Sequence, residues 1–419
     1  MFLRLAAAEV EAALGDSRAV VLMGARQVGK STLMAACAGP DEGWSWVNLD
    51  DDVLREAAER DADGFLSDQG VPLAIDEVQR VPELMLAIKM RVDRDNRPGQ
   101  FLLSGSANIL TVPRIADSLT GRAEYIRLAP LTQVELLGRE SEFLPSLLRG
   151  EISHLAGQQS GRRAYAAAIA TGGFPAAVRW DRARLARFFD SYVDTVIDRD
   201  LRDLADIEDP EGMRRLLRAI AATSGGTLKF ASLGNDLQMN DQTIRRYFRL
   251  LEMLFLVRRV PAWSSNLLTR LTKAPKAYVA DTGLLLALIG GDEERVVRDL
   301  DLGGSLFETF AVMEILRLLE VLPHRPAPFH FRDRDGREVD LLLERRDGGI
   351  VGIEVKASGT VTAKDFRGLR YLRDKLGDRF VIGVILYAGQ TTVPFGGGLW
   401  AVPISALWGG GAPYASREG

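Results

Sequence analysis

The feature that most constrains this chain is a glycine-rich loop between an apolar run and a segment with helical apolar periodicity. Residues 24–32 read Gly-Ala-Arg-Gln-Val-Gly-Lys-Ser-Thr and follow the apolar residues 20–23. Two glycines let the backbone curl so that its N–H groups point at phosphate oxygens, and a following helix adds partial positive charge. The spacing predicts a strand, a phosphate-binding loop and a helix. The predicted binding residues are Gly24, Ala25, Arg26, Gln27, Val28, Gly29, Lys30, Ser31 and Thr32.

A second apolar run, residues 71–75, ends in Asp76 and Glu77. A buried parallel strand delivers such acids to its C-terminal edge. We expect Lys30 to contact the β- and γ-phosphates, Ser31 and Asp76 to hold Mg²⁺, and Glu77 to polarise the attacking water. The alternative is a strand followed by a solvated acidic turn.

The N-terminal third alternates short apolar strands with segments long enough for crossover helices, which predicts a mostly parallel sheet. Ser106 follows one strand and could act as a γ-phosphate sensor or simply belong to a Gly/Ser turn. Arg122 precedes another and could stabilise transition-state charge, in its own chain or on a neighbouring subunit, unless it is an exposed loop arginine. If Arg122 acts on a neighbouring subunit, the protein forms a homo-oligomer. The expected strands are 19–23, 44–49, 72–76, 100–104 and 124–128.

A series of short motifs extends beyond the loop. They are Gly24–Ser31, Leu73–Gln79, Leu102–Ser106, Thr120–Arg122, Leu128–Thr132, Gly172–Pro175, and Tyr192 followed by Arg199-Asp200-Leu201. Their order resembles the prokaryotic AAA-superfamily ATPases that carry a C-terminal domain of unknown function. The resemblance covers nearly the whole chain and implies an ATPase domain of the additional-strand class, with ATP and Mg²⁺ as its ligands.

The middle of the chain predicts helices followed by a hairpin. Residues 136–212 have helical spacing and are expected to form a lid or linker. From residue 213, two helices, a turn and a third helix at 242–253, capped by Asp241, precede strands at 255–260 and 278–281. This order is typical of a winged helix-turn-helix. The third helix could bring arginines to nucleic-acid phosphates, or the domain could serve as a plain protein contact. Those arginines are Arg245, Arg246 and Arg249.

The C-terminal third predicts a polar cluster on a hairpin. The Asp-Gly pair at 347–348 lies between two apolar strands and favours a tight turn, which places Asp340 almost opposite Glu354. Lys356 shares a face with Glu354 because the two are two residues apart on a strand. A preceding helix, residues 303–320, carries Glu308. The tail, residues 391–419, is rich in glycine and proline and is expected to end in loose structure.

Asp340, Glu354-Val355-Lys356 and the helical Glu308 together resemble the PD-(D/E)XK restriction-endonuclease-like superfamily, although Val339 stands where its proline would be. The resemblance implies phosphodiester hydrolysis, with the three acids holding Mg²⁺ and Lys356 orienting the attacking water. The alternative is a hairpin with an exposed salt bridge.

Composition limits the kinds of protein this chain can be. No apolar run reaches 18 residues, so we expect no membrane helix, and Cys37 is the only cysteine, so we expect no disulfide framework. Both features favour a cytoplasmic location. With a net charge of −4, any nucleic-acid contact must be a local patch. The three histidines form no zinc spacing with the cysteine.

The expected fold is α/β with four parts: a P-loop parallel-sheet ATPase domain (1–135), a helical lid or linker (136–212), a winged helix (213–285) and an α/β restriction-endonuclease-like domain (300–405). We expect a Mg²⁺-dependent ATPase that couples ATP hydrolysis to nucleic-acid binding or processing through the last two domains. The alternatives are an ATP-switched regulatory protein that cuts nothing, and a signalling ATPase whose C-terminal domain binds protein.

Overall fold

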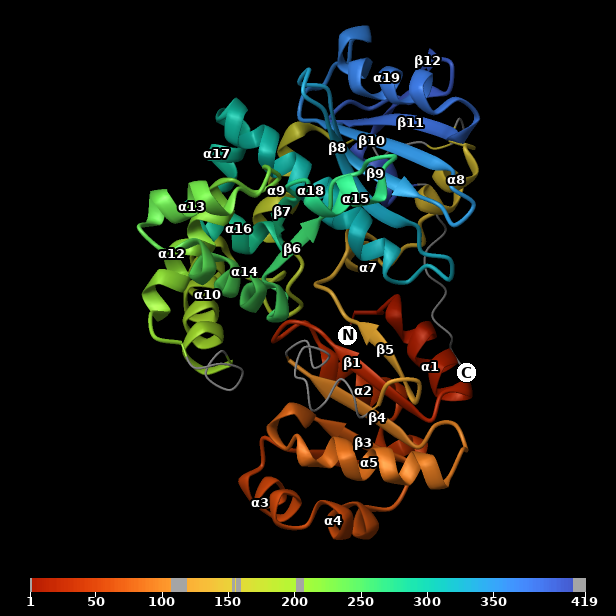
Figure 1. Cartoon of the computed structure of the whole chain (residues 1–419), viewed down its shortest axis with the longest axis vertical. Helices are drawn as coiled ribbons and strands as arrows, with labels where there is room; N and C mark the ends of the chain where they lie inside the picture. The colour runs from red at the N-terminus through yellow and green to blue at the C-terminus, as the bar shows by residue number, and fades with distance from the viewer. Residues whose placement is uncertain (1, 107–118, 153–154, 156–159, 201–206, 410–419) are drawn as a thin grey trace.

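The computed structural model describes residues 2–106, 119–152, 155, 160–200 and 207–409. The N-terminal sheet lies at one end of the long axis and the C-terminal sheet at the other, with the middle helices beside the C-terminal region (Figure 1). Leu201 and residues 107–108, which follow the Ser106 motif, lie outside the described residues. No helix in the described part of the chain is long and apolar enough to cross a membrane.

The N-terminal region is a five-stranded sheet in the order β2-β3-β4-β1-β5, and all four pairings are parallel. The predicted parallel sheet is confirmed. Since every strand runs the same way, the ends of β1, β3 and β4 meet at one edge, where the candidate site lies. The elements are α1 (Ala6–Asp16), β1 (Ala19–Met23), α2 (Lys30–Cys37), β2 (Ser45–Asn48), α3 (Asp52–Arg60), α4 (Ala62–Gln69), β3 (Leu73–Asp76), α5 (Glu83–Arg94), β4 (Phe101–Gly105) and β5 (Ala123–Arg127).

The middle region begins with helices that join the two sheets. Part of it contacts the C-terminal region directly: Ser141 Oγ donates to the carbonyl of Leu407 at 2.7 Å, and Arg345 Nη1 to that of Leu148 at 2.9 Å. The first half of the predicted linker therefore packs on the C-terminal region. The helices are α7 (Gln133–Leu137), α8 (Phe143–Arg149), α9 (Arg162–Thr171), α10 (Arg182–Thr195) and the π-helical turn η4 (Val196–Asp200).

Three helices and a two-stranded antiparallel sheet follow, in the predicted order. Large apolar side chains of α14 are buried, including Ile244, Tyr247, Phe248 and Leu251. The cap was predicted wrongly: Asn240, not Asp241, accepts the Thr243 N–H at 2.7 Å and begins the helix. The elements are α12 (Pro210–Ala222), α13 (Phe230–Leu237), α14 (Asp241–Met253), β6 (Val257–Val260), α15 (Leu267–Thr272), β7 (Lys276–Val279), α16 (Thr282–Leu288) and α17 (Glu293–Arg298).

The C-terminal region is a six-stranded mixed sheet in the order β12-β13-β11-β10-β9-β8. The hairpin register pairs Leu341 with Ile353, so the next position sets Asp340 opposite Glu354, as predicted. Within the tail from residue 391, β12 and β13 pair as strands, and its last residues, 410–419, lie outside the described residues. The elements are α18 (Leu300–Leu319), β8 (Ala327–Arg332), β9 (Glu338–Glu344), β10 (Ile350–Lys356), α19 (Arg367–Leu376), β11 (Phe380–Tyr387), β12 (Val393–Gly396) and β13 (Leu399–Pro403).

Candidate functional site

The glycine loop connects β1 to α2 and has the shape that its sequence predicts. Gly29 precedes the helix in the left-handed region, with φ +96°, a conformation that favours glycine. A Cβ on Gly24 would lie 2.2 Å from the carbonyl oxygen of Leu128, so a side chain there cannot be accommodated without a shift. The loop is thus packed closely against the end of β5, and its two glycines are sterically required.

Lys30 opens α2 and turns back over the loop. Its Nζ lies 3.1 Å from the carbonyl oxygens of Gly24 and of Ala25, and the side chain is buried. Ser31 and Thr32, in the same first turn of the helix, are exposed. The loop therefore presents an ammonium, two hydroxyls and a helix N-terminus in one small region, a donor set that suits a polyphosphate and its metal ion.

Asp76 and Glu77 follow β3 at the same sheet edge. Asp76 is buried; one of its carboxylate oxygens accepts the Ser104 hydroxyl and, at 3.1 Å, the Glu77 N–H. Glu77 has a left-handed backbone, φ +57°, which is uncommon for a residue other than glycine. That turn sends the two neighbouring carboxylates in different directions.

Two polar side chains complete this edge. The Gln79 side-chain amide donates to the Glu77 carboxylate and, at 3.0 Å, to the Ser106 hydroxyl. Ser106 is thus linked to Glu77 through Gln79, and Ser104 holds Asp76. The sequence analysis gave neither Gln79 nor Ser104 a role. Gln79 lies two residues after Glu77, and the alignment of β4 beside β3 brings Ser104 and Ser106 to this edge.

Arg122 does not lie beside the glycine loop of its own chain. It immediately precedes β5, whose first residue Ala123 pairs with Ala19 at the start of β1, whereas the loop follows the end of β1. The guanidinium donates to Asp93 at 2.5 and 3.0 Å, and these hydrogen bonds lower the pKa of that carboxyl. Arg122 is thus paired with Asp93 at the end of β5 away from the loop, and its catalytic role, in its own chain or on a neighbouring subunit, stays a prediction.

An apolar cavity of about 220 Å³ borders the glycine loop. The N-terminal residues form one wall and α2 another. Pro175, from the Gly-Gly-Phe-Pro motif, closes it from the middle region. The side chains that give the cavity its apolar character include Phe2, Leu3, Ala7, Leu33, Ala36 and Pro175.

The predicted C-terminal acids surround a lysine that sequence reasoning missed. Lys276, on β7, extends its ammonium to Glu308 at 2.8 Å and to Asp340 at 2.9 Å. Glu338 lies 2.8 Å from the same nitrogen, and only 1% of the lysine side chain is exposed. Tyr278 also donates to Glu308, at 2.8 Å. One buried cation from the middle region is thus shared by three C-terminal carboxylates.

Protonation in this acidic cluster (Lys276, Glu308, Glu338, Asp340 and Glu354) reflects burial. Burial and the Asp340 charge raise the pKa of Glu308 to about 7, and the same two causes raise that of Glu354 well above its ordinary value. Burial disfavours the Lys276 ammonium, but the surrounding carboxylates outweigh this and raise its pKa well above the usual value.

Glu354 follows the same hairpin register opposite Asp340. One of its oxygens accepts Lys356 at 2.9 Å, and the other, buried, has no hydrogen-bond partner among the described residues. Asp340 also accepts the Val355 N–H at 2.9 Å. The structure thus brings the four predicted residues together, with lysines already paired to them. Within the described ranges, no group of three or more His, Cys, Asp or Glu side chains has the arrangement to hold a metal ion.

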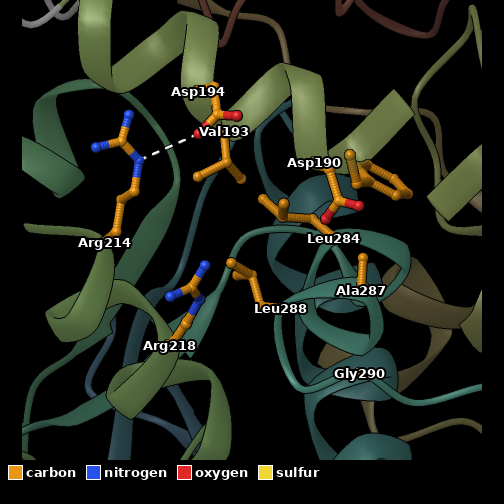
Figure 2. Close-up of a pocket in the computed structure, with 10 residues that line it drawn as sticks. Asp190, Val193, Asp194, Arg214, Arg218, Leu284, Ala287, Leu288 and Gly290 are labelled. Carbon is orange, nitrogen blue, oxygen red and sulfur yellow. Dashed lines mark hydrogen bonds and ion pairs between the residues drawn. The ribbon is translucent and has the colours of Figure 1, made fainter. Parts of the chain in front are cut away.

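A second cavity, of about 480 Å³, lies between α10, α12 and α16 (Figure 2). Arg214 and Arg218 line one side and Asp190 and Asp194 the other; Arg214 donates to Asp194 at 3.1 Å. Its charges largely offset one another, and it lies in the middle region, apart from the glycine loop. Sequence reasoning did not find it, because its walls come from three separate helices.

Comparison with known proteins assigns a class to the N-terminal region. A family model described as an AAA domain matches residues 16–137. Two further models match residues 162–295 and 303–407, and both describe domains of unknown function, DUF8612 and DUF4143. With the geometry of the loop, the first match makes this region an AAA-type P-loop ATPase domain.

Whole-chain relatives carry no described function. An uncharacterised protein of Mycobacterium tuberculosis and one of Mycobacterium bovis are each 29% identical over 409 residues, which is 96% of this chain and 84% of theirs. Among solved structures, AMPPCP-bound DnaA from Aquifex aeolicus is 14% identical, over 59% of this chain and 85% of that one, with a TM-score of 0.26. The RuvB Holliday junction branch migration motor of Thermotoga maritima is 18% identical, over 62% and 90%, with a TM-score of 0.29.

Proposed function

We propose that this chain is a Mg²⁺-dependent ATPase. The observation that carries the proposal is the loop itself: a left-handed Gly29, an ammonium folded over the loop, and Asp76 at the same edge of a parallel sheet. The four-part division at residues 135, 212, 285 and 405 is part of the proposal.

Each residue of this edge has a chemical role in the proposal. Lys30 binds the terminal phosphates, and Ser31 with Asp76 would hold Mg²⁺, which supplies charge neutralisation to the transferred phosphoryl group. Glu77 orients the attacking water and accepts its proton. Ser106 is the proposed γ-phosphate sensor, and its hydrogen bond to Gln79 links it to the Glu77 carboxylate.

The apolar cavity beside the loop suits the base of the nucleotide. It borders Gly29 and Thr32, so a ligand whose phosphates occupy the loop could extend a flat ring into it. Apolar walls favour burial of an aromatic ring, whereas the charged walls of the 480 Å³ cavity do not. The proposal therefore assigns the nucleotide to the N-terminal region alone.

Two substitutions test the assignment. Lys30→Ala should weaken binding of a fluorescent ATP analogue. Glu77→Gln should bind the analogue normally, but its rate of phosphate release should fall by about 100-fold or more. Lys364→Ala removes an exposed lysine and serves as the control. Normal phosphate release by both site variants would refute the catalytic assignment.

We further propose that hydrolysis is coupled to nucleic acid, through the exposed arginines of α14 and the C-terminal region. These are Arg245, Arg246 and Arg249, of which Arg245 is paired with Asp241 at 2.6 Å. Phosphate release measured with single-stranded DNA, duplex DNA and RNA tests the coupling. Stimulation by one of them supports it, and indifference to all three favours a regulatory or signalling ATPase.

One observation favours the second candidate, in which the C-terminal domain binds a partner without cutting nucleic acid. Lys276 supplies to Glu308 and Asp340 the positive charge that a metal ion would otherwise supply. Gel analysis of nucleic acid incubated with Mg²⁺ or Mn²⁺ separates the two candidates. Cleavage that Asp340→Asn abolishes would refute the second.

A further inference from the structure

Arg4, in the segment before α1, forms a contact that no motif assigns. Its guanidinium donates through Nη1 to the carbonyl of Val28 at 2.6 Å and through Nη2 to that of Ala129 at 2.6 Å. Its Nε donates to Glu135 at 2.9 Å. The side chain is 8% exposed, so one buried arginine joins the glycine loop, the end of β5 and the start of α7.

The carboxylate that holds Arg4 is itself fixed. Glu135 accepts the Leu5 N–H at 3.0 Å through the oxygen that Arg4 uses. Its other oxygen accepts the N–H of Thr132 at 2.8 Å and the hydroxyl of Thr132 at 3.1 Å, completing a capping box at α7. Because these hydrogen bonds hold the Glu135 carboxylate in place, they also fix the direction in which the Arg4 guanidinium points.

The hydrogen bond from Arg4 to the Val28 carbonyl fixes the orientation of the Val28–Gly29 peptide, whose N–H can bind a phosphate oxygen. A trans peptide is planar, so the N–H of Gly29 points opposite to the Val28 carbonyl. With that carbonyl bound to Arg4, the Gly29 N–H is directed away from Arg4 and is free to bind a phosphate oxygen from within the loop. Gly29 has no side chain and φ +96°, so its backbone is the most easily reoriented in the loop.

We propose that Arg4 is a positioning residue for nucleotide binding and hydrolysis, acting by fixing the Val28–Gly29 peptide. This inference rests on the proposed ATPase function. It adds to that function, because the ability of the loop to bind phosphate would depend on a residue 20 positions before Gly24, in the N-terminal segment. Arg4 also lines the apolar cavity assigned to the base, but its hydrogen bonds are to protein groups and it is distinct from the groups assigned to the phosphates.

Arg4→Lys tests the proposal. Lysine keeps the charge and can pair with Glu135, but a single ammonium cannot reproduce the planar fork that reaches two carbonyls and the carboxylate. Losing a charge-assisted hydrogen bond to the loop should weaken binding of a fluorescent ATP analogue by about 10-fold or more, and turnover at saturating ATP should also fall. The melting temperature without nucleotide should change little.

Arg91→Lys is the matched control. Arg91 also donates to two backbone carbonyls, those of Leu66 at 3.2 Å and Asp63 at 2.9 Å, but it joins α5 to α4, remote from the loop. It should bind and hydrolyse ATP as the wild type does. Arg4→Met, which also removes the charge, should be at least as impaired as Arg4→Lys.

The outcomes separate this inference from the proposed function. If the wild-type chain neither binds nor hydrolyses ATP, the proposed function fails. If it does both and Arg4→Lys matches it in affinity and in turnover per folded molecule, Arg4 is structural only and the inference is overturned. A lowered melting temperature with unchanged nucleotide affinity would have the same meaning.

Discussion

Replacing Lys276 by methionine tests how much the buried ammonium contributes to the junction between the middle and C-terminal regions. Methionine keeps most of the volume but removes the charge. Three carboxylates, 2.8, 2.8 and 2.9 Å from the nitrogen, would lose their shared partner at a side chain that is 1% exposed. Removing one side of a buried ion pair costs about 3–5 kcal/mol, so we expect a loss of that order at pH 8.

The pH dependence gives the prediction its sign. In the wild type, the pKa of Lys276 is raised, so its stabilising charge is fully present below its unfolded pKa of about 10.5 and does not change between pH 5.5 and 8. In Lys276→Met, the pKa of Glu308, which burial already raises to about 7, should rise further above its unfolded value, because the lysine charge that lowers it is lost. Acids with raised folded pKa values gain stability as the pH falls. The deficit of the variant should therefore shrink by about 1–3 kcal/mol between pH 8 and pH 5.5.

Urea denaturation followed by tryptophan fluorescence at both pH values measures the deficit. Trp263 is fully buried and its backbone N–H donates to the carbonyl of His330 at 2.6 Å, so its indole reports on the same junction. Lys273→Met is the control: its lysine lies three residues away, is not buried and reaches only the Arg332 carbonyl, at 3.5 Å. We expect it to lie within about 0.5 kcal/mol of wild type. A Lys276→Met protein as stable as the wild type at pH 8, or equally destabilised at both pH values, would refute the reasoning.

Three further outcomes are expected. A mixture of Arg122→Ala and Glu77→Gln should release phosphate faster than the mean of the separate proteins if Arg122 acts across a subunit boundary; a value equal to the mean argues against a shared site. Gly172→Ala should cost about 2–3 kcal/mol in urea denaturation, because φ is +69° and its Cβ would lie 2.2 Å from a buried aspartate oxygen, whereas Gly290→Ala, at φ +61° in open space, should cost only about 1 kcal/mol. Burial lowers the pKa of His330 to about 4, so its contribution to stability is present above pH 6.5 and is lost as the pH falls toward 4. His330→Gln should therefore lose less stability than the wild type between pH 6.5 and 4 in urea denaturation. The same loss of stability in both proteins over this range would contradict the prediction.

The nucleotide edge could be predicted from sequence because its information is local. The glycine loop and Asp76-Glu77 each occupy one continuous stretch, and strand alternation with crossover segments is enough to align their ends. The Asp340–Glu354 register could be predicted for the same reason, since a tight turn at 347–348 determines it. What neighbouring strands add, such as Gln79 bridging Glu77 and Ser106, required the strand order.

The remaining features depend on contacts between distant segments. Nothing about Lys276 in sequence distinguishes it from a solvated lysine, and its acidic partners lie 32 to 64 residues away. The run Gly396-Gly397-Gly398 suggested loose structure, yet all three adopt positive φ, 80°, 58° and 75°, and make the turn between β12 and β13. A composition rich in glycine is consistent with either outcome, and only the pairing of the flanking strands decides it.

The packing of the segment after α7 on the C-terminal region has a consequence for synthesis on the ribosome. Ser141 bonds to Leu407, 266 residues later, and Leu155 accepts a hydrogen bond from Thr392, 237 residues later. At about 5–20 residues per second, roughly 10–50 s separate the emergence of these partners. The AAA domain can complete its sheet during that interval, while α8 packs on α18, β11 and the turn Ile404–Leu407, all of which are made after residue 299. A translational pause or premature stop before residue 300 would leave the buried face of α8, including Phe143, Leu144 and Leu147, exposed to chaperones and proteases.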